Sequence, residues 1–202
     1  ALPILWTKNK IIATTDFVNP LSNIFNEHYH GAACFSILAS NSPGALMGTA
    51  PQASYLLLRT EDANTENLIE EYNWASAAEY ADSAGADLFS TSLGYTTFDI
   101  AAQNHTYSTL DGNTAPMTIA ADIASSRGIV VVNSAGNDGN NSWNFIGAPA
   151  DANNILAIGA VNSSGNYASF SSNGPTIDGR VKPDVSAMGS GTAYCSPFSG
   201  AI

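Results

Sequence analysis

Three segments of the chain place a polar side chain among small residues, where a helix is expected to begin or a strand to end. They are residues 28–31 around His30, residues 133–139 around Asn137, and residues 191–197 after Gly191. A hydrolase with a hydroxyl nucleophile needs a base, an acid that orients the base, and hydrogen-bond donors for the oxyanion. The three segments contain residue types that suit these roles.

His30 precedes Gly31 at the start of a run of small and apolar residues. A histidine at a helix start can expose its ring at a cleft and act there as a general base. A surface histidine that caps the helix is the alternative, because helix starts commonly carry polar residues. This segment alone leaves both interpretations open.

Asn137 follows a strongly apolar run and lies in the sequence Asn-Ser-Ala-Gly-Asn-Asp-Gly. Small residues at the end of a central parallel strand leave space for a ligand, and sites in α/β folds form at such ends. The Asn137 amide could donate a hydrogen bond to an oxyanion. An ordinary Asn-Asp-Gly turn is the alternative.

The third segment begins at Gly191, which permits a tight bend, and reaches Pro197, which suits the first turn of a helix. The alternative is a helix start with conventional turn chemistry.

The elements that must position these segments are predicted from the apolar periodicity. Period-2 runs alternate with longer amphipathic runs, which is typical of a parallel sheet flanked by helices. We expect a fully buried strand at residues 129–133 and a buried helix at residues 30–40. Further strands are expected at residues 10–17, 53–59, 86–93 and 154–161, and a strand that runs into a turn is expected at residues 168–175. Further helices are expected at residues 66–84, 115–127 and from residue 196.

Length and charge exclude several classes of protein. A chain of 202 residues without a linker or repeat predicts one α/β domain. The net charge of −11 argues against nucleic acid as a partner. No apolar run is long enough to span a membrane, and residues 1–6 do not resemble a signal peptide. The two cysteines have no metal-binding spacing, so no metal site is predicted.

Short motifs in a fixed order connect these segments. They are His-Gly at 30–31, Gly-Thr-Ala-Pro at 48–51, Ser-Leu-Gly at 92–94, Ala-Gly-Asn at 135–137, Ala-Ser-Phe-Ser-Ser-Asn-Gly-Pro at 168–175, Lys-Pro-Asp-Val at 182–185 and Gly-Thr-Ala-Tyr-Cys-Ser-Pro at 191–197. In this order they resemble the subtilisin-like (S8) peptidase family, over about residues 14–202. An unrelated α/β hydrolase or nucleotide-binding domain is set aside, because no Gly-x-Ser-x-Gly elbow or phosphate-binding loop is present.

The resemblance implies a three-layer α/β fold with a central, mostly parallel sheet flanked by helices. It implies a serine endopeptidase with an Asp-His-Ser triad, in which His30 is the base and Asn137 the oxyanion donor. Substrate-binding positions follow from the same motifs. Ser92, Leu93 and Gly94 would pair with the substrate backbone as an added strand, and Ser134, Ala135 and Gly136 would line the pocket for the residue before the scissile bond. A peptide or protein is then the substrate of a monomeric, secreted bacterial protein without a cofactor. Structural calcium is common in the family, but the acidic residues of the loops do not match a known calcium-binding pattern.

The nucleophile position departs from the family pattern, because Ala193 stands there. Alanine has no hydroxyl, so we expect no measurable proteolysis. Ser196 matches the family's second serine and should face away from the cleft, and Cys195 belongs to the helix interior. A non-catalytic module that binds peptides or proteins through the retained cleft is the alternative function.

The acid is the second departure. Asp16 ends a strand 14 residues before His30, but its segment resembles the family's second strand. We therefore expect a solvated Asp16 and an acid on a strand further upstream. Only five residues separate Val185 from Gly191, where the family usually has a longer stretch. We therefore expect residues 1–202 to be a single catalytic domain that is shortened before Gly191 and truncated at both ends.

In the family, the helices that carry Cys34 and Cys195 pack side by side, so the resemblance implies two buried, unpaired thiols near one another. A disulfide would need Cα atoms within about 7 Å.

Overall fold

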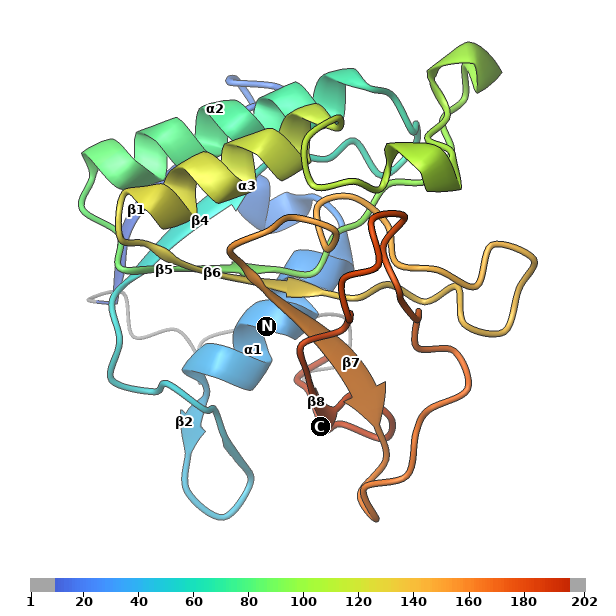
Figure 1. Cartoon of the computed structure of the whole chain (residues 1–202). Helices are drawn as coiled ribbons and strands as arrows, with labels where there is room; N and C mark the ends of the chain where they lie inside the picture. The colour runs from blue at the N-terminus through green and yellow to red at the C-terminus, as the bar shows by residue number, and fades with distance from the viewer. Residues whose placement is uncertain (1–9, 197–202) are drawn as a thin grey trace. The chain divides into compact units, whose positions relative to one another are not determined.

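The chain divides into two units, of which the second is an insertion in the first. Residues 1–59 and 192–202 form the first unit, and residues 60–191 form the second. The computed structural model describes residues 10–196 (Figure 1).

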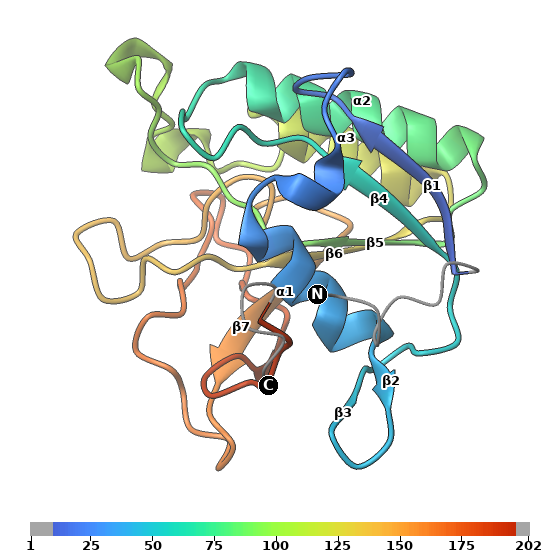
Figure 2. The ribbon, with the colours of Figure 1, turned by 180° about the vertical axis from the view of Figure 1, so that it is seen from behind.

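The first unit contains a parallel strand pair and one helix. Strands β1 (Ile11–Asp16) and β4 (Tyr55–Arg59) pair in parallel, with Asp16 opposite Arg59 at their carboxyl ends (Figure 2). Between them lie the short helix η1 (Ile24–Asn26), helix α1 (Tyr29–Ala39), and a small antiparallel hairpin of β2 (Asn41–Ser42) and β3 (Leu46–Met47).

The first residue of the Gly-Thr-Ala-Pro motif, Gly48, packs closely against the end of α1. A Cβ at this position would lie 2.2 Å from the carbonyl oxygen of Leu38, near the end of α1. The Gly48 N–H donates to the carbonyl oxygen of Ser40 at 2.7 Å. Only glycine lets the chain approach the end of the helix this closely.

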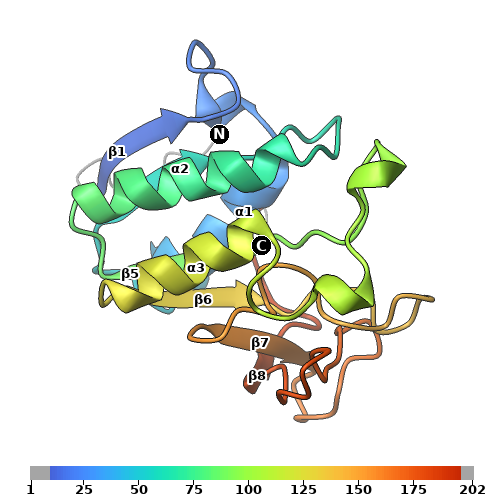
Figure 3. The ribbon, with the colours of Figure 1, turned by 45° about the horizontal axis from the view of Figure 1, so that its top comes forward.

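The second unit is a parallel sheet covered on one face by two helices. The sheet order is β5 (Leu88–Thr91), β6 (Val130–Ser134), β7 (Leu156–Val161) and β8 (Val185–Met188). Helices α2 (Ile69–Ser83) and α3 (Pro116–Ser126) lie side by side along the strands (Figure 3). The short helices η2 (Ala101–Gln103) and η3 (Tyr107–Thr109) lie between β5 and α3. The core between helices and sheet includes Trp74, Ala78, Met117, Ala121, Val131 and Ile155.

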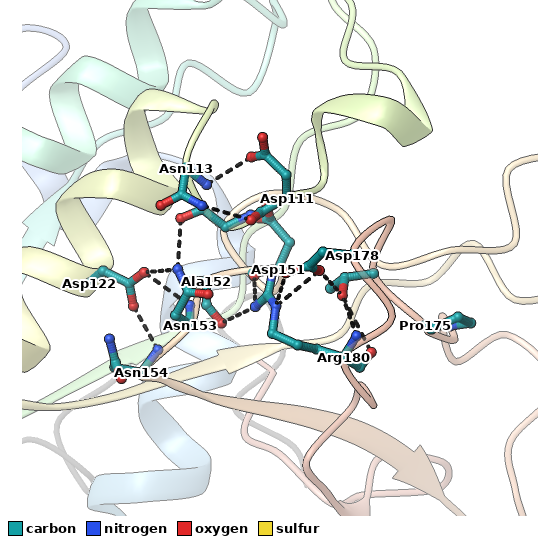
Figure 4. Close-up of polar contacts among 12 residues, drawn as sticks. Asp111, Asn113, Asp122, Asp151, Ala152, Asn153, Asn154, Pro175, Asp178 and Arg180 are labelled. Carbon is teal, nitrogen blue, oxygen red and sulfur yellow. Dashed lines mark hydrogen bonds and ion pairs between the residues drawn. The ribbon is translucent and has the colours of Figure 1, made fainter.

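A polar network joins α3 to the chain that enters β7 (Figure 4). Asp122 on α3 accepts hydrogen bonds from the backbone N–H groups of Asn153 at 3.0 Å and Asn154 at 2.7 Å. Asp151 is completely buried, and burial raises the pKa of its carboxyl group. The Arg180 guanidinium donates to the backbone carbonyl of Asp151 at 2.6 Å. These bonds pair backbone groups of the connection between α3 and β7 with the side chains of Asp122 and Arg180.

The mixed α/β class, with parallel strand pairing and helices, is confirmed. The strand predicted at residues 168–175 is wrong, because that segment forms turns and only an isolated bridge at Asn173. Strand β8 was not predicted. The helix expected from residue 196 lies almost entirely outside the described residues.

Two predicted burial patterns are also wrong. Strand β6 alternates, with Val130 48% exposed and Val131 1% exposed, because helices cover one face of the sheet. In α1 only Ala33, Ser36 and Ala39 are buried, so the helix is buried along one stripe. No helix in the described part of the chain is long and apolar enough to cross a membrane.

Candidate active site

His30 lies in the first turn of α1, in the first unit. The N-cap is His28, whose Nδ1 accepts a hydrogen bond from the His30 N–H at 3.4 Å. The capping role therefore belongs to His28. The His30 side chain is exposed, and its Nε2 lies 3.6 Å from the Sγ of Cys34, one turn further along the helix.

The Ala193 segment is attached to the same helix. The backbone N–H of Cys195 donates to the Oγ of Ser36 at 2.9 Å, and this hydroxyl donates to the carbonyl of Ala33 at 2.7 Å. Gly191 adopts a positive φ of 76°, which allows the bend before the segment. Ala193 is exposed and follows two residues later. The first unit thus brings the predicted base and the predicted nucleophile position to α1.

Asp16 has a different environment from the one expected. It is 6% exposed, so the prediction of a solvated strand end is wrong. Its Oδ1 accepts from the backbone N–H groups of Val18 and Asn19, and its Oδ2 accepts from the Ser22 hydroxyl and, at 2.9 Å, from Arg59. Burial alone would raise its pKa, but these hydrogen bonds lower the pKa of Asp16 to about 2. The carboxylate closes the turn after β1.

The second unit contains a cavity of about 480 Å³ at the carboxyl ends of β5 and β6. The lining includes Asn137 and five of the six predicted substrate-binding residues, namely Ser92, Leu93, Gly94, Ser134 and Gly136. Within residues 10–196, no hydrogen bond engages the exposed Asn137 amide. The sixth predicted substrate-binding residue, Ala135, does not line the cavity. Its side chain packs in a core cluster with Leu110, Ile146, Ala150 and Ala157.

Asn133 connects the two walls of this cavity. It is 1% exposed, and its Nδ2 donates to the carbonyl of Leu93 at 3.1 Å and to that of Ser134 at 2.7 Å. The sequence placed Asn133 in the motif but gave it no role. A polar residue at the end of an apolar strand was the available signal.

The turn before Asn137 is held by the segment at residues 171–172. Gly136 has a φ of 111°, and a Cβ there would lie 2.7 Å from the Oγ of Ser172. The same hydroxyl accepts from the Asp138 N–H at 2.9 Å, while the Ser172 N–H donates to the Gly136 carbonyl at 3.0 Å. Gly136 and Ser172 therefore hold the backbone on both sides of Asn137.

Carboxylates at the cavity were not identified from the sequence. Glu66, Asp99 and Asp138 all line it. Burial, followed by the charges of Glu61 and Asp99, raises the pKa of Glu66. Burial, together with the charges of Glu61 and Glu66, raises the pKa of Glu70 to about 7. Glu66 and Asp99 are 33 positions apart, so no local motif predicts their proximity.

Cys34 and Cys195 form no disulfide, as expected. Cys195 is buried, but Cys34 is only half-buried because it lies beside the buried stripe of α1. The prediction of a buried thiol is therefore wrong for Cys34.

Several known proteins are similar to this chain in sequence or in fold. Thermitase from Thermoactinomyces vulgaris is 32% identical over 174 residues, which cover 84% of this chain and 54% of thermitase. Serine protease AprX from Bacillus subtilis (strain 168) is 30% identical over 197 residues, 90% of this chain and 42% of AprX. The chain thus spans about half the length of these curated relatives.

The solved structure of the prenylagaramide maturation protease PagA superposes with a TM-score of 0.68 at 21% identity, over 97% of this chain and 62% of PagA. A mutant of the protease domain of PatA gives a TM-score of 0.63 at 21% identity, over 91% of this chain and 65% of that domain. At these identities the likeness is one of fold. Residues 7–201 match the model of the subtilase family, and the chain therefore belongs to that family.

Proposed function

We propose that this chain provides the peptide-binding and catalytic framework of a subtilisin-like serine endopeptidase, in a form that binds peptides without cleaving them. In this proposal His30 is the general base, Asn137 donates to the oxyanion, and Ala193 occupies the nucleophile position. The acid would be supplied by a residue other than Asp16, because both oxygens of Asp16 already accept hydrogen bonds.

The observation that carries the proposal is the cavity, whose walls are Ser92, Leu93 and Gly94 on one side and Ser134 and Gly136 on the other. The exposed Asn137 amide stands beside these walls. A substrate that pairs with residues 92–94 as an added strand would gain backbone hydrogen bonds independent of its side chains. An amide donor is suited to the charge that develops on a carbonyl oxygen.

Ala193 favours the second candidate function, a non-catalytic subtilase-like module. Both candidates bind peptide in the same cavity, and they differ in whether the natural protein carries a nucleophile. A peptide or protein ligand, a monomeric state and an extracellular bacterial location are part of the proposal. The net charge of −11 is consistent with such a location, and thermitase and AprX come from bacteria.

Peptide binding tests the proposal directly. An extended hexapeptide and variants with a single N-methylated backbone amide are titrated into the protein by calorimetry. N-methylation at alternate positions is expected to weaken binding about tenfold or more, because each removes a donor needed for strand pairing. Methylation at the intervening positions is the matched control. Equal affinity across the series would contradict strand pairing, and absence of binding would contradict the proposed function.

A further inference from the structure

Two acidic residues at the cavity, Glu66 and Asp99, are joined by a pair of hydrogen bonds. The Asp99 N–H donates to the Glu66 carbonyl at 2.8 Å, and the Glu66 N–H donates to the Asp99 Oδ2 at 3.2 Å. This pairing joins the segment before α2 to the segment after β5. Both residues line the cavity, and Asp138 lines it as well.

No cation balances these charges in the lining. None of the residues that surround the cavity is lysine, arginine or histidine. Elsewhere in the second unit, Arg180 pairs with Asp178 at 2.8 Å and Lys182 pairs with Asp184 at 2.8 Å.

Glu70, in the first turn of α2, responds to the negative charge of this region. Glu70 is only 2% exposed, and its Oε1 accepts a weak hydrogen bond from the Asp62 N–H at 3.3 Å. Its Oε2 is buried and has no hydrogen-bond partner among residues 10–196. The charges of Glu61 and Glu66 act on this carboxyl. Burial and these like charges raise the pKa of the Glu70 carboxyl to about 7, as expected for an acid in a region of negative charge.

The cation is better matched by a side chain than by a metal ion. Among the described residues, no group of three or more His, Cys, Asp or Glu side chains is arranged to hold a metal. Leu93 and Phe98 also line the cavity. They offer apolar surface to the methylene stem of a lysine or arginine while its charged head reaches the carboxylates.

We propose that the acidic end of this cavity, formed by Glu66 and Asp99, selects peptides with a lysine or arginine side chain. This inference rests on the proposed peptide-binding function and names its substrate class. Glu66 and Asp99 are specificity-determining residues in this account.

The test compares peptides that differ only in charge. Alanine-based hexapeptides carry lysine at each position in turn, and matched series carry norleucine, which has nearly the same shape without the charge, or glutamate. At one position lysine is expected to bind roughly tenfold more tightly than norleucine, with glutamate weaker than both. The preference should shrink in 0.5 M salt, since screening weakens exposed charge pairs.

Variants identify the carboxylates. Glu66→Gln and Asp99→Asn should each reduce the lysine preference several-fold while leaving norleucine binding unchanged. Glu79→Gln, on the exposed side of α2, changes the net charge equally and should leave the preference intact.

The outcomes separate the two proposals. Equal binding of lysine and norleucine peptides at every position would overturn the inference and leave the peptide-binding function standing. If no hexapeptide binds, both proposals fail. Stoichiometric binding of Ca²⁺ that depends on Glu66 and Asp99, without a lysine preference, would overturn the inference in favour of a metal site.

Discussion

Asn133 shows how a single buried side chain holds both walls of the cavity. Its amide donates to the carbonyls of Leu93 and Ser134, which belong to the ends of different strands. The motif order in the sequence predicted that these walls would meet. It did not predict the bond that joins them, because the amide reaches a carbonyl 40 positions away.

Replacement of Asn133 by leucine is expected to destabilise the fold by about 2–3 kcal/mol, because two partly buried carbonyls lose their donor. Peptide affinity should fall as well, since the walls are no longer joined. Urea denaturation and calorimetric titration measure the two effects. The control is Asn140→Leu at an exposed turn, which should change stability by less than about 0.5 kcal/mol. Equal effects of the two substitutions would contradict the role of Asn133.

The buried Asp16 carboxylate is expected to make the stability of the fold depend on pH. Its pKa is lowered from 3.8 to about 2, so its ionised form stabilises the folded state. That contribution is complete above pH 4 and is lost as the pH falls toward 2. We expect Asp16→Asn to cost roughly 1–2 kcal/mol at pH 7, after allowance for solvent screening, and much less at pH 2.

Denaturation midpoints between pH 2 and pH 7 measure the Asp16 effect. Asp82→Asn, at an exposed position on α2, is the matched control. A stability difference between the wild type and Asp16→Asn that stays constant with pH would contradict the ionic role of Asp16.

At the scale of elements, apolar periodicity predicted β1, β4, β5, β6, β7 and the three helices to within a few residues. Strand β8 was not predicted, because it is short and directly follows Pro183 and Asp184. The segment at residues 168–175 alternates like a strand, but its hydroxyls bind other parts of the chain. The Ser171 hydroxyl accepts from the Ala160 N–H in β7, and the Ser172 hydroxyl accepts from the Asp138 N–H in a loop. A period-2 pattern does not distinguish these roles.

The contact between α2 and α3 depends on Glu71. Its Oε1 lies 2.5 Å from the Nε2 of His105, and its Oε2 accepts from the Met117 N–H at 3.1 Å, in the first turn of α3. Glu71→Ala would leave buried polar groups without a partner, so we expect a loss of about 3 kcal/mol and a lower Tm. Glu79→Ala, on the exposed side of α2, should have little effect. A Tm equal to that of the wild type would contradict this account.

The whole molecule distributes the proposed roles over its two units. His30 and Ala193 belong to the first unit, and Asn137 and the cavity belong to the second, which is inserted between β4 and residue 192. Family membership followed from seven short motifs in order along the chain. The acidic end of the cavity could not be found in this way, because Glu66 and Asp99 come together only through the fold.

The most direct test of the account restores the nucleophile. The wild type, Ala193→Ser, and Ala193→Ser combined with His30→Ala are incubated for hours with a fluorophosphonate, and the modified residue is located by mass spectrometry. We predict one adduct on residue 193 in Ala193→Ser, no adduct in the wild type, and a strongly reduced adduct without His30, because the serine needs a base. A wild type that reacts at Ser196, or a restored serine that reacts equally without His30, would contradict the assignment of Ala193 and His30 to the catalytic positions.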